Sequence, residues 1–149
     1  LNGGTYYDYY QTKDGRYLSV GSLEPQFMQG LAQVLDLPVL LEKGTSFDSD
    51  DRKQVKQAIQ AKILTRTWAE WSNTFAALDI CVEPVLRLDE ALNSPLAQAR
   101  KWIVQVPVAA DLKKTEPQLA CPIKFSRSQA RYTFSGQSLG EGNWPESSQ

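Results

Sequence analysis

The sequence contains no histidine. Histidine is the commonest acid–base group of enzymes at neutral pH, so its absence excludes a Ser-His-Asp or Cys-His catalyst made from this chain alone. It also excludes a metal site with histidine ligands. The cysteines Cys81 and Cys121 are too few and too far apart to predict a disulfide framework or a zinc site. We therefore expect no metal, a reducing compartment, and thiols without a chemical role.

Long apolar runs and an excess of charge are missing as well. No apolar run approaches the ~18 residues of a membrane-spanning helix, and the first residues lack the pattern of a secretory signal peptide. The formal net charge of -1 provides no basic footprint for nucleic acid or for an anionic membrane. We expect a cytoplasmic protein that binds neither.

Methionine occurs only at Met28, and the sequence begins at Leu1. This start does not suggest a natural start of translation. We therefore expect the chain to be part of a larger protein. The length of 149 residues suits one domain with a core of its own. Hydrophobic residues make up 42% and charged residues 22%, which is ordinary for a globular domain.

A β-hairpin and a helix are predicted at the start of the chain. A tyrosine-rich segment, the turn pair Asp14-Gly15 and an alternating segment predict a hairpin over residues 6–21. Pro25 suits the first position of a helix that stops at Leu37-Pro38. The apolar stripe of this helix consists of Phe27, Leu31, Val34 and Leu35. Residues 40–51 are predicted to form a loop.

Two further helices are predicted in the middle of the chain. Between residues 52 and 64, apolar side chains repeat at helical spacing opposite a basic face. Thr67 and Glu70 have the spacing of a capping box and predict the start of the next helix. The side chains that this helix should bury are Trp71, Phe75 and Leu78.

The remaining segments predict short elements and then an extended tail. Residues 81–86 predict a short strand, 89–92 and 95–101 short helical segments, and 102–106 a further strand. No sustained periodicity follows Pro107. The fold class is therefore α+β: a small antiparallel sheet, made of the hairpin and one or two further strands, with three to four helices. We expect residues 1–106 to form the small domain of a larger enzyme. Residues 107–149 should form an extended C-terminal segment that is mobile in isolation.

Glu24 lies where the second strand of the hairpin is predicted to give way to a helix. The helix dipole and the free N–H groups at a helix start favour negative charge, so we expect Glu24 to stay ionised. An ionised carboxylate there suits orienting a neighbouring cation or imidazole better than carrying protons itself. A purely structural place at a helix start explains the same spacing, so the residue pattern alone leaves both interpretations open.

Several segments together carry a family resemblance. The most specific is Glu24-Pro25-Gln26-Phe27, supported by residues 14–17, 69–71, 79–85 and 99–100. With these segments the chain resembles the C-terminal part of the α-methylacyl-CoA racemases, within the CaiB/BaiF (class III) CoA-transferase superfamily. The resemblance extends from Leu1 to about Val106. The transferase branch usually has glycines and no such glutamate in this region, so the motif favours a racemase.

The resemblance implies an enzyme that inverts the α-carbon of 2-methyl-branched acyl-CoA thioesters by 1,1-proton transfer, without a metal or redox cofactor. In these racemases a histidine and an aspartate of the large N-terminal domain carry the protons, and the motif glutamate hydrogen-bonds the histidine. It thus implies a catalytic role for Glu24 and contact of Tyr7 and Leu23 with the acyl chain. Strand packing for Tyr7 and core packing for Leu23 are the alternatives.

The resemblance also implies partners that this chain lacks. The family's active site needs the N-terminal large domain, and its full-length members form homodimers, so we expect the chain alone to be inactive. Two other functions stay open: a class III CoA-transferase that moves CoA between carboxylic acids, and a non-catalytic binding module. Asp79 and Cys81 are expected to be structural. The basic cluster is expected to be a solvated or packing surface rather than a site for CoA phosphates; it comprises Lys113, Lys114, Lys124, Arg127 and Arg131.

Overall fold

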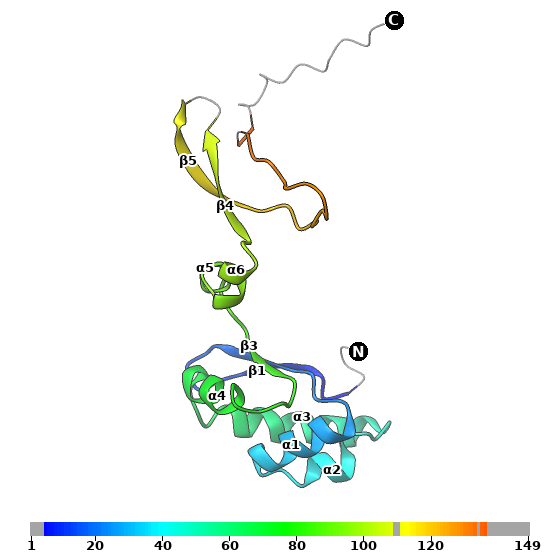
Figure 1. Cartoon of the computed structure of the whole chain (residues 1–149). Coiled ribbons are helices and arrows are strands. Elements are labelled where there is room, and N and C mark those ends of the chain that lie inside the picture. Colours follow the sequence, from blue (N-terminus) through cyan, green and yellow to red (C-terminus); the bar gives the residue numbers. More distant parts are fainter. Residues whose placement is uncertain (1–4, 109–110, 134, 137–149) are drawn as a thin grey trace, which may run out of the picture. The chain divides into compact units, whose positions relative to one another are not determined.

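The computed structural model describes residues 5–108, 111–133 and 135–136, and the chain divides into two compact units. Unit 1 comprises Leu1–Val85 and unit 2 comprises Leu86–Gln149. The described residues of unit 1 form strands β1–β3 and helices α1–α4, and those of unit 2 form helices α5 and α6 with strands β4 and β5 (Figure 1). The predicted α+β fold class is confirmed for this part of the chain.

A three-stranded antiparallel sheet forms one layer of unit 1. Its strands are β1 (Asp8–Gln11), β2 (Tyr17–Val20) and β3 (Val82–Pro84), in the order β1-β2-β3. The β1–β2 hairpin is confirmed, and Gly15 in its turn has a φ of 78°, a left-handed conformation that glycine adopts without strain. The alternating residues Leu18 and Val20 point into the core, where both are fully buried.

Four helices supply the second layer of unit 1. They are α1 (Pro25–Leu35), α2 (Val39–Lys43), α3 (Ser49–Ile63) and α4 (Trp68–Phe75). Figure 1 shows them gathered on one side of the sheet. The predicted stripe of α3 is confirmed, because Val55, Ile59 and Ile63 are buried. The capping box of α4 is confirmed too: the Thr67 hydroxyl accepts a hydrogen bond from the Glu70 N–H, and the Glu70 carboxylate accepts one from the Thr67 N–H.

Two details of unit 1 differ from the predictions. Residues 40–51 are not a loop, because α2 and the first turn of α3 occupy much of that range. The predicted stop at Leu37-Pro38 is confirmed, because α1 ends at Leu35, and Pro38 is also the N-cap residue of α2. Leu78 is 44% exposed rather than buried. Helix α4 ends at Phe75, so Leu78 no longer follows the helical spacing that would have turned it inward.

Unit 2 consists of two short helices and a hairpin. Helices α5 (Leu88–Leu92) and α6 (Pro95–Ala99) precede an antiparallel pair, β4 (Ile103–Val108) and β5 (Asp111–Leu119). The prediction that no regular structure follows Pro107 was therefore wrong for β5. That strand is almost entirely exposed and polar, so it carries no alternation of its own and is defined by its pairing with β4. Residues 120–133 and 135–136 form neither helix nor strand, and the rest of the predicted tail lies outside the described residues.

The number of elements also exceeds the prediction. The described residues contain six helices, of which α1, α3 and α4 have seven or more residues, instead of three to four. The extra ones are the five-residue helices, which are too short to show a periodicity. No helix in the described part of the chain has both the length and the apolar character to cross a bilayer.

Helix α1 packs closely against the segment that leads into β3. A Cβ atom added at Gly30 would lie 2.4 Å from Cγ2 of Ile80, a distance that real contacts do not reach. Cγ2 branches directly from the Cβ of Ile80, so it cannot swing away as the end of a long side chain could. The absence of a side chain at Gly30 is therefore what lets α1 approach Ile80.

We expect Gly30→Ala to destabilise unit 1 by about 2 kcal/mol, because the added methyl group overpacks this contact. Gln29→Ala, on an exposed position of the same helix, is the matched control and should be neutral or slightly stabilising. Urea unfolding followed by tryptophan fluorescence measures both variants. A Gly30→Ala chain as stable as the control would contradict the packing described.

Candidate functional site

Glu24 is the N-cap residue of helix α1. Its backbone is extended, with φ −70° and ψ 144°, and its carbonyl oxygen accepts a hydrogen bond from the N–H of Met28 at 2.9 Å. Pro25 follows in the first turn, where its missing N–H leaves no donor unsatisfied. Glu24 thus lies at the junction of strand β2 and helix α1, at the positive end of the helix dipole.

The carboxylate of Glu24 has no bonding partner within the described part of the chain. It accepts no capping hydrogen bond from α1, and it forms no ion pair or side-chain hydrogen bond with another described residue. The residue is exposed, and the first turn of α1 contains no other acidic side chain. An acceptor group at a helix start therefore remains available to a donor outside the described residues.

The turn that carries Glu24 is held by hydrogen bonds from two distant segments. The N–H of Gly21 donates to the carbonyl of Cys81 at 2.9 Å, which extends the pairing of β2 and β3 into the turn. Ser22 is fully buried; its hydroxyl donates to the carbonyl of Ile80, and its own carbonyl accepts from the hydroxyl of Tyr6. Tyr6 and Ser22 showed no spacing signal in the sequence, because their contact depends on how the hairpin folds.

The negative charge of Glu24 affects two neighbouring groups. Burial raises the pKa of Tyr6 to about 12, and the Glu24 carboxylate contributes to this rise. The pKa of the Cys81 thiol is also raised, first by desolvation and then by the charges of Glu24, Asp79 and Glu83. A raised pKa leaves little thiolate at neutral pH, so Cys81 is a poor nucleophile. Its backbone has a positive φ of 48° at the bend before β3, which suits a structural role.

Tyr7 and Leu23 are both associated with the same turn, one through its ring and the other as a residue of the turn. Tyr7 is 37% exposed, and an added Cβ at Gly21 would stand 3.3 Å from its ring, so this ring covers the start of the turn. Leu23 is partly buried and packs against the core of unit 1. The fold therefore brings Tyr7, Leu23 and Glu24 together around one turn. Their contact with an acyl chain remains a prediction.

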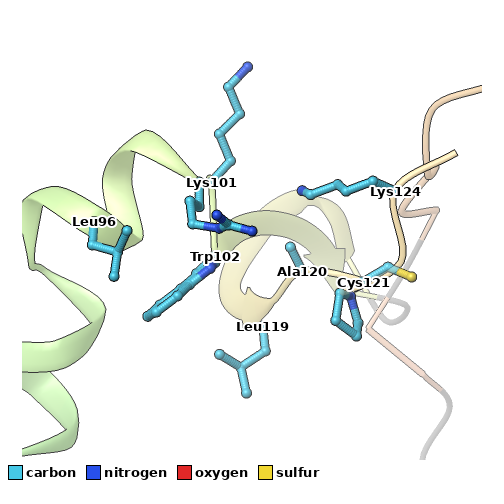
Figure 2. A pocket seen from close by; sticks show the side chains of 9 residues that line it. Leu96, Lys101, Trp102, Leu119, Ala120, Cys121 and Lys124 are labelled. Carbon is cyan, nitrogen blue, oxygen red and sulfur yellow. The ribbon is translucent and has the colours of Figure 1, made fainter. Parts of the chain in front are cut away.

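A hollow of the described residues lies elsewhere, in unit 2. It has a volume of about 620 Å³, and it is lined by none of Glu24, Tyr7 and Leu23. Figure 2 shows the side chains of Trp102, Leu119 and Lys124 around it. Of the basic cluster only Lys124 lines this hollow. Its size alone does not make it a site, because a hollow on a part of a larger protein is also expected where other residues pack. Within the described ranges, no cluster of three or more histidine, cysteine or acidic side chains could hold a metal ion.

Comparison with known protein families shows the family to which this chain belongs. The model of "CoA-transferase family III" matches residues 2–143. The chain belongs to CoA-transferase family III. It is 37% identical over 94 residues to an α-methylacyl-CoA racemase of Mus musculus, which covers 62% of this chain and 24% of the relative. A Caenorhabditis elegans CaiB/baiF CoA-transferase family protein is 31% identical over 84 residues, covering 56% of this chain and 23% of the relative. The chain thus spans about a quarter of the length of these relatives.

Solved structures show the same fold. The crystal structure of Rv3272 from Mycobacterium tuberculosis matches with a TM-score of 0.67 and 19% identity, over 85% of this chain and 36% of that chain. A CaiB/BaiF family protein from Brucella suis matches with a TM-score of 0.66 and 15% identity, over 91% of this chain and 35% of that chain. The family resemblance inferred from the sequence motifs is confirmed.

We expect Glu24→Gln to make Cys81 more reactive, because it removes one of the charges that raise the pKa of this thiol. In a Cys121→Ser chain, iodoacetamide at pH 8 should alkylate Cys81 roughly two- to threefold faster after the substitution. Glu42→Gln, which removes a carboxylate from α2, is the control and should not alter the rate. Equal rates with and without Glu24 would mean that the two side chains are not neighbours.

Proposed function

We propose that this chain is the small-domain part of an enzyme that inverts the α-carbon of 2-methyl-branched acyl-CoA thioesters. The observation that carries the proposal is the exposed carboxylate of Glu24 at the start of α1, which has no bonding partner among the described residues. Glu24 belongs to the segment Glu24-Pro25-Gln26-Phe27, the most specific part of the racemase resemblance. Support comes from the identity with the racemases of Mus musculus and Homo sapiens, at 37% and 35% over 94 residues.

The proposed reaction needs groups that this chain does not contain. Removing the proton next to a thioester carbonyl produces an enolate, and returning a proton to the opposite face completes the inversion. Two proton carriers are needed, one on each face of the α-carbon. With no histidine in this sequence, we assign them to a histidine and an aspartate of an N-terminal large domain. The 149-residue chain alone is then inactive.

Glu24 takes the role of orienting the imidazole. A carboxylate that accepts a hydrogen bond from one ring nitrogen fixes the tautomer and the direction of the other nitrogen, and it stabilises the ring when it is protonated. The position at a helix start favours the ionised carboxylate that this role requires. No metal or redox cofactor is needed for such a proton transfer.

We assign contact with the acyl chain to two side chains near the turn, those of Tyr7 and Leu23. Tyr7 offers a partly exposed aromatic surface against Gly21, and Leu23, which precedes Glu24 in the sequence, offers a partly buried aliphatic one. An apolar wall there would hold the branched chain while the thioester carbon faces the proton carriers. We further propose that the full-length enzyme is a homodimer, in which the small domain meets the large domain of the partner.

A class III CoA-transferase is the second candidate, and the family description and the nematode relative favour it. Such an enzyme moves CoA from a thioester to a carboxylic acid. Incubating the full-length protein with one α-deuterated acyl-CoA and no acceptor distinguishes the two reactions. Loss of deuterium to water indicates the racemase, whereas turnover that depends on an added carboxylic acid indicates the transferase.

Glu24→Gln in the full-length protein should lower the rate of α-proton exchange by about 10²-fold, the scale of one positioned acid–base partner. The affinity for CoA should not change, because the family resemblance implies that the large domain binds most of the CoA nucleotide. Exchange of deuterium from solvent into the α-position, followed by mass spectrometry, measures the rate. CoA affinity can be measured by calorimetry.

Glu83→Gln is the matched control for this experiment. It makes the same chemical change at another carboxylate close to Cys81, but on strand β3 rather than at the start of α1. This variant should keep the parent rate. An unchanged rate for Glu24→Gln, or an equal loss for both variants, would remove Glu24 from the mechanism.

A further inference from the structure

We propose that Tyr6 is a positioning residue, whose buried hydroxyl holds the turn at Ser22 and thereby places the Glu24 carboxylate. The inference rests on the proposed function of Glu24 and extends it to a residue that touches neither substrate nor imidazole. Tyr6 lies just before β1 in the sequence, 16 residues from its bonding partner Ser22. From the sequence, the tyrosine-rich segment that contains Tyr6 predicts only a strand.

The contact is fully enclosed. Tyr6 is 2% exposed and Ser22 is 0% exposed, and the Tyr6 hydroxyl donates directly to the Ser22 carbonyl. A buried carbonyl that loses its donor has no water to replace it, so the turn cannot shift without cost. Of all side chains that could fill this volume, a phenylalanine would preserve the ring and remove only the donor. The role of the hydroxyl can therefore be tested separately from the packing of the ring.

Ser22 is held from a second side as well. Its hydroxyl donates to the carbonyl of Ile80, and the N–H of the preceding Gly21 donates to the carbonyl of Cys81. The turn closes with the N–H of Leu23 donating to the carbonyl of Gly21 at 2.8 Å. Only Leu23 separates Ser22 from Glu24, so fixing Ser22 leaves the Glu24 backbone little freedom. The N-cap geometry of Glu24 at the start of α1 further restricts the conformation of its backbone.

The electrostatics of the pair suit a permanent donor. Burial, with a contribution from the Glu24 charge, raises the pKa of Tyr6 to about 12, so the phenol stays protonated over the whole range in which enzymes work. A protonated phenol can donate to the carbonyl of Ser22 at every such pH. The contact is therefore a constant constraint on the turn and not a switch.

Tyr6→Phe in the full-length protein should lower kcat for α-proton exchange about tenfold, with KM changed less than about twofold, because a small displacement of a positioned group costs rate rather than binding. Thr12→Val is the matched control. It also removes a buried hydroxyl, at the other end of the β1–β2 hairpin, and should lower thermal stability without lowering kcat. Ser22→Ala removes the second anchor of the turn and should reduce kcat in the same way as Tyr6→Phe.

The double variant Tyr6→Phe/Glu24→Gln separates this inference from the proposed function. A residue that acts only through Glu24 has nothing left to position once the carboxylate is gone, so the double variant should be no slower than Glu24→Gln alone. If Glu24→Gln itself keeps the parent rate, the proposed function fails and this inference with it. If Glu24→Gln is slow but Tyr6→Phe keeps kcat, or lowers it by the same factor in both backgrounds, the inference is wrong while the proposed function stands.

Discussion

The burial of Ser22 between Tyr6 and Ile80 is the constraint on which the site depends. The hydroxyl and the carbonyl of this residue are bonded to segments distant in the sequence, and the residue is fully buried. Such a residue specifies one arrangement of the chain, because any other leaves a buried donor or acceptor without a partner. The hairpin, the segment before β3 and the start of α1 are thereby fixed to one another. Glu24 lies at the point where the three meet.

The two units differ in what stabilises them. Unit 1 encloses a contiguous core that includes Leu31, Ile59 and Trp71, so its sheet and helices are held by packing as well as by hydrogen bonds. In unit 2, the only buried apolar side chains among the described residues are Ala97 and Val106, while Leu88 and Leu119 are about 70% exposed. Exposed apolar side chains of this kind are usual on a surface that another part of a protein covers. This difference fits a chain that spans about a quarter of its relatives.

The sequence was sufficient where a local pattern determines the structure. The turn pair Asp14-Gly15, the capping box of Thr67 and the stripe of α3 were all predicted, because each depends on neighbours within a few residues. Strand β5 was not, because its polar residues acquire a strand conformation only by pairing with β4. The location of Glu24 at a helix start was predicted from Pro25. The anchoring of its turn was not, since no local spacing connects Tyr6, Ser22 and Ile80.

The most direct test of the account is the environment of Glu24 in a crystal structure of the full-length protein with an acyl-CoA bound. The account predicts a histidine nitrogen from the large domain at ~2.8 Å from the Glu24 carboxylate, the usual length of a charge-assisted hydrogen bond. The other nitrogen of that ring should face the α-carbon of the thioester. A Glu24 carboxylate that contacts only solvent, or that lies far from the thioester, would contradict it.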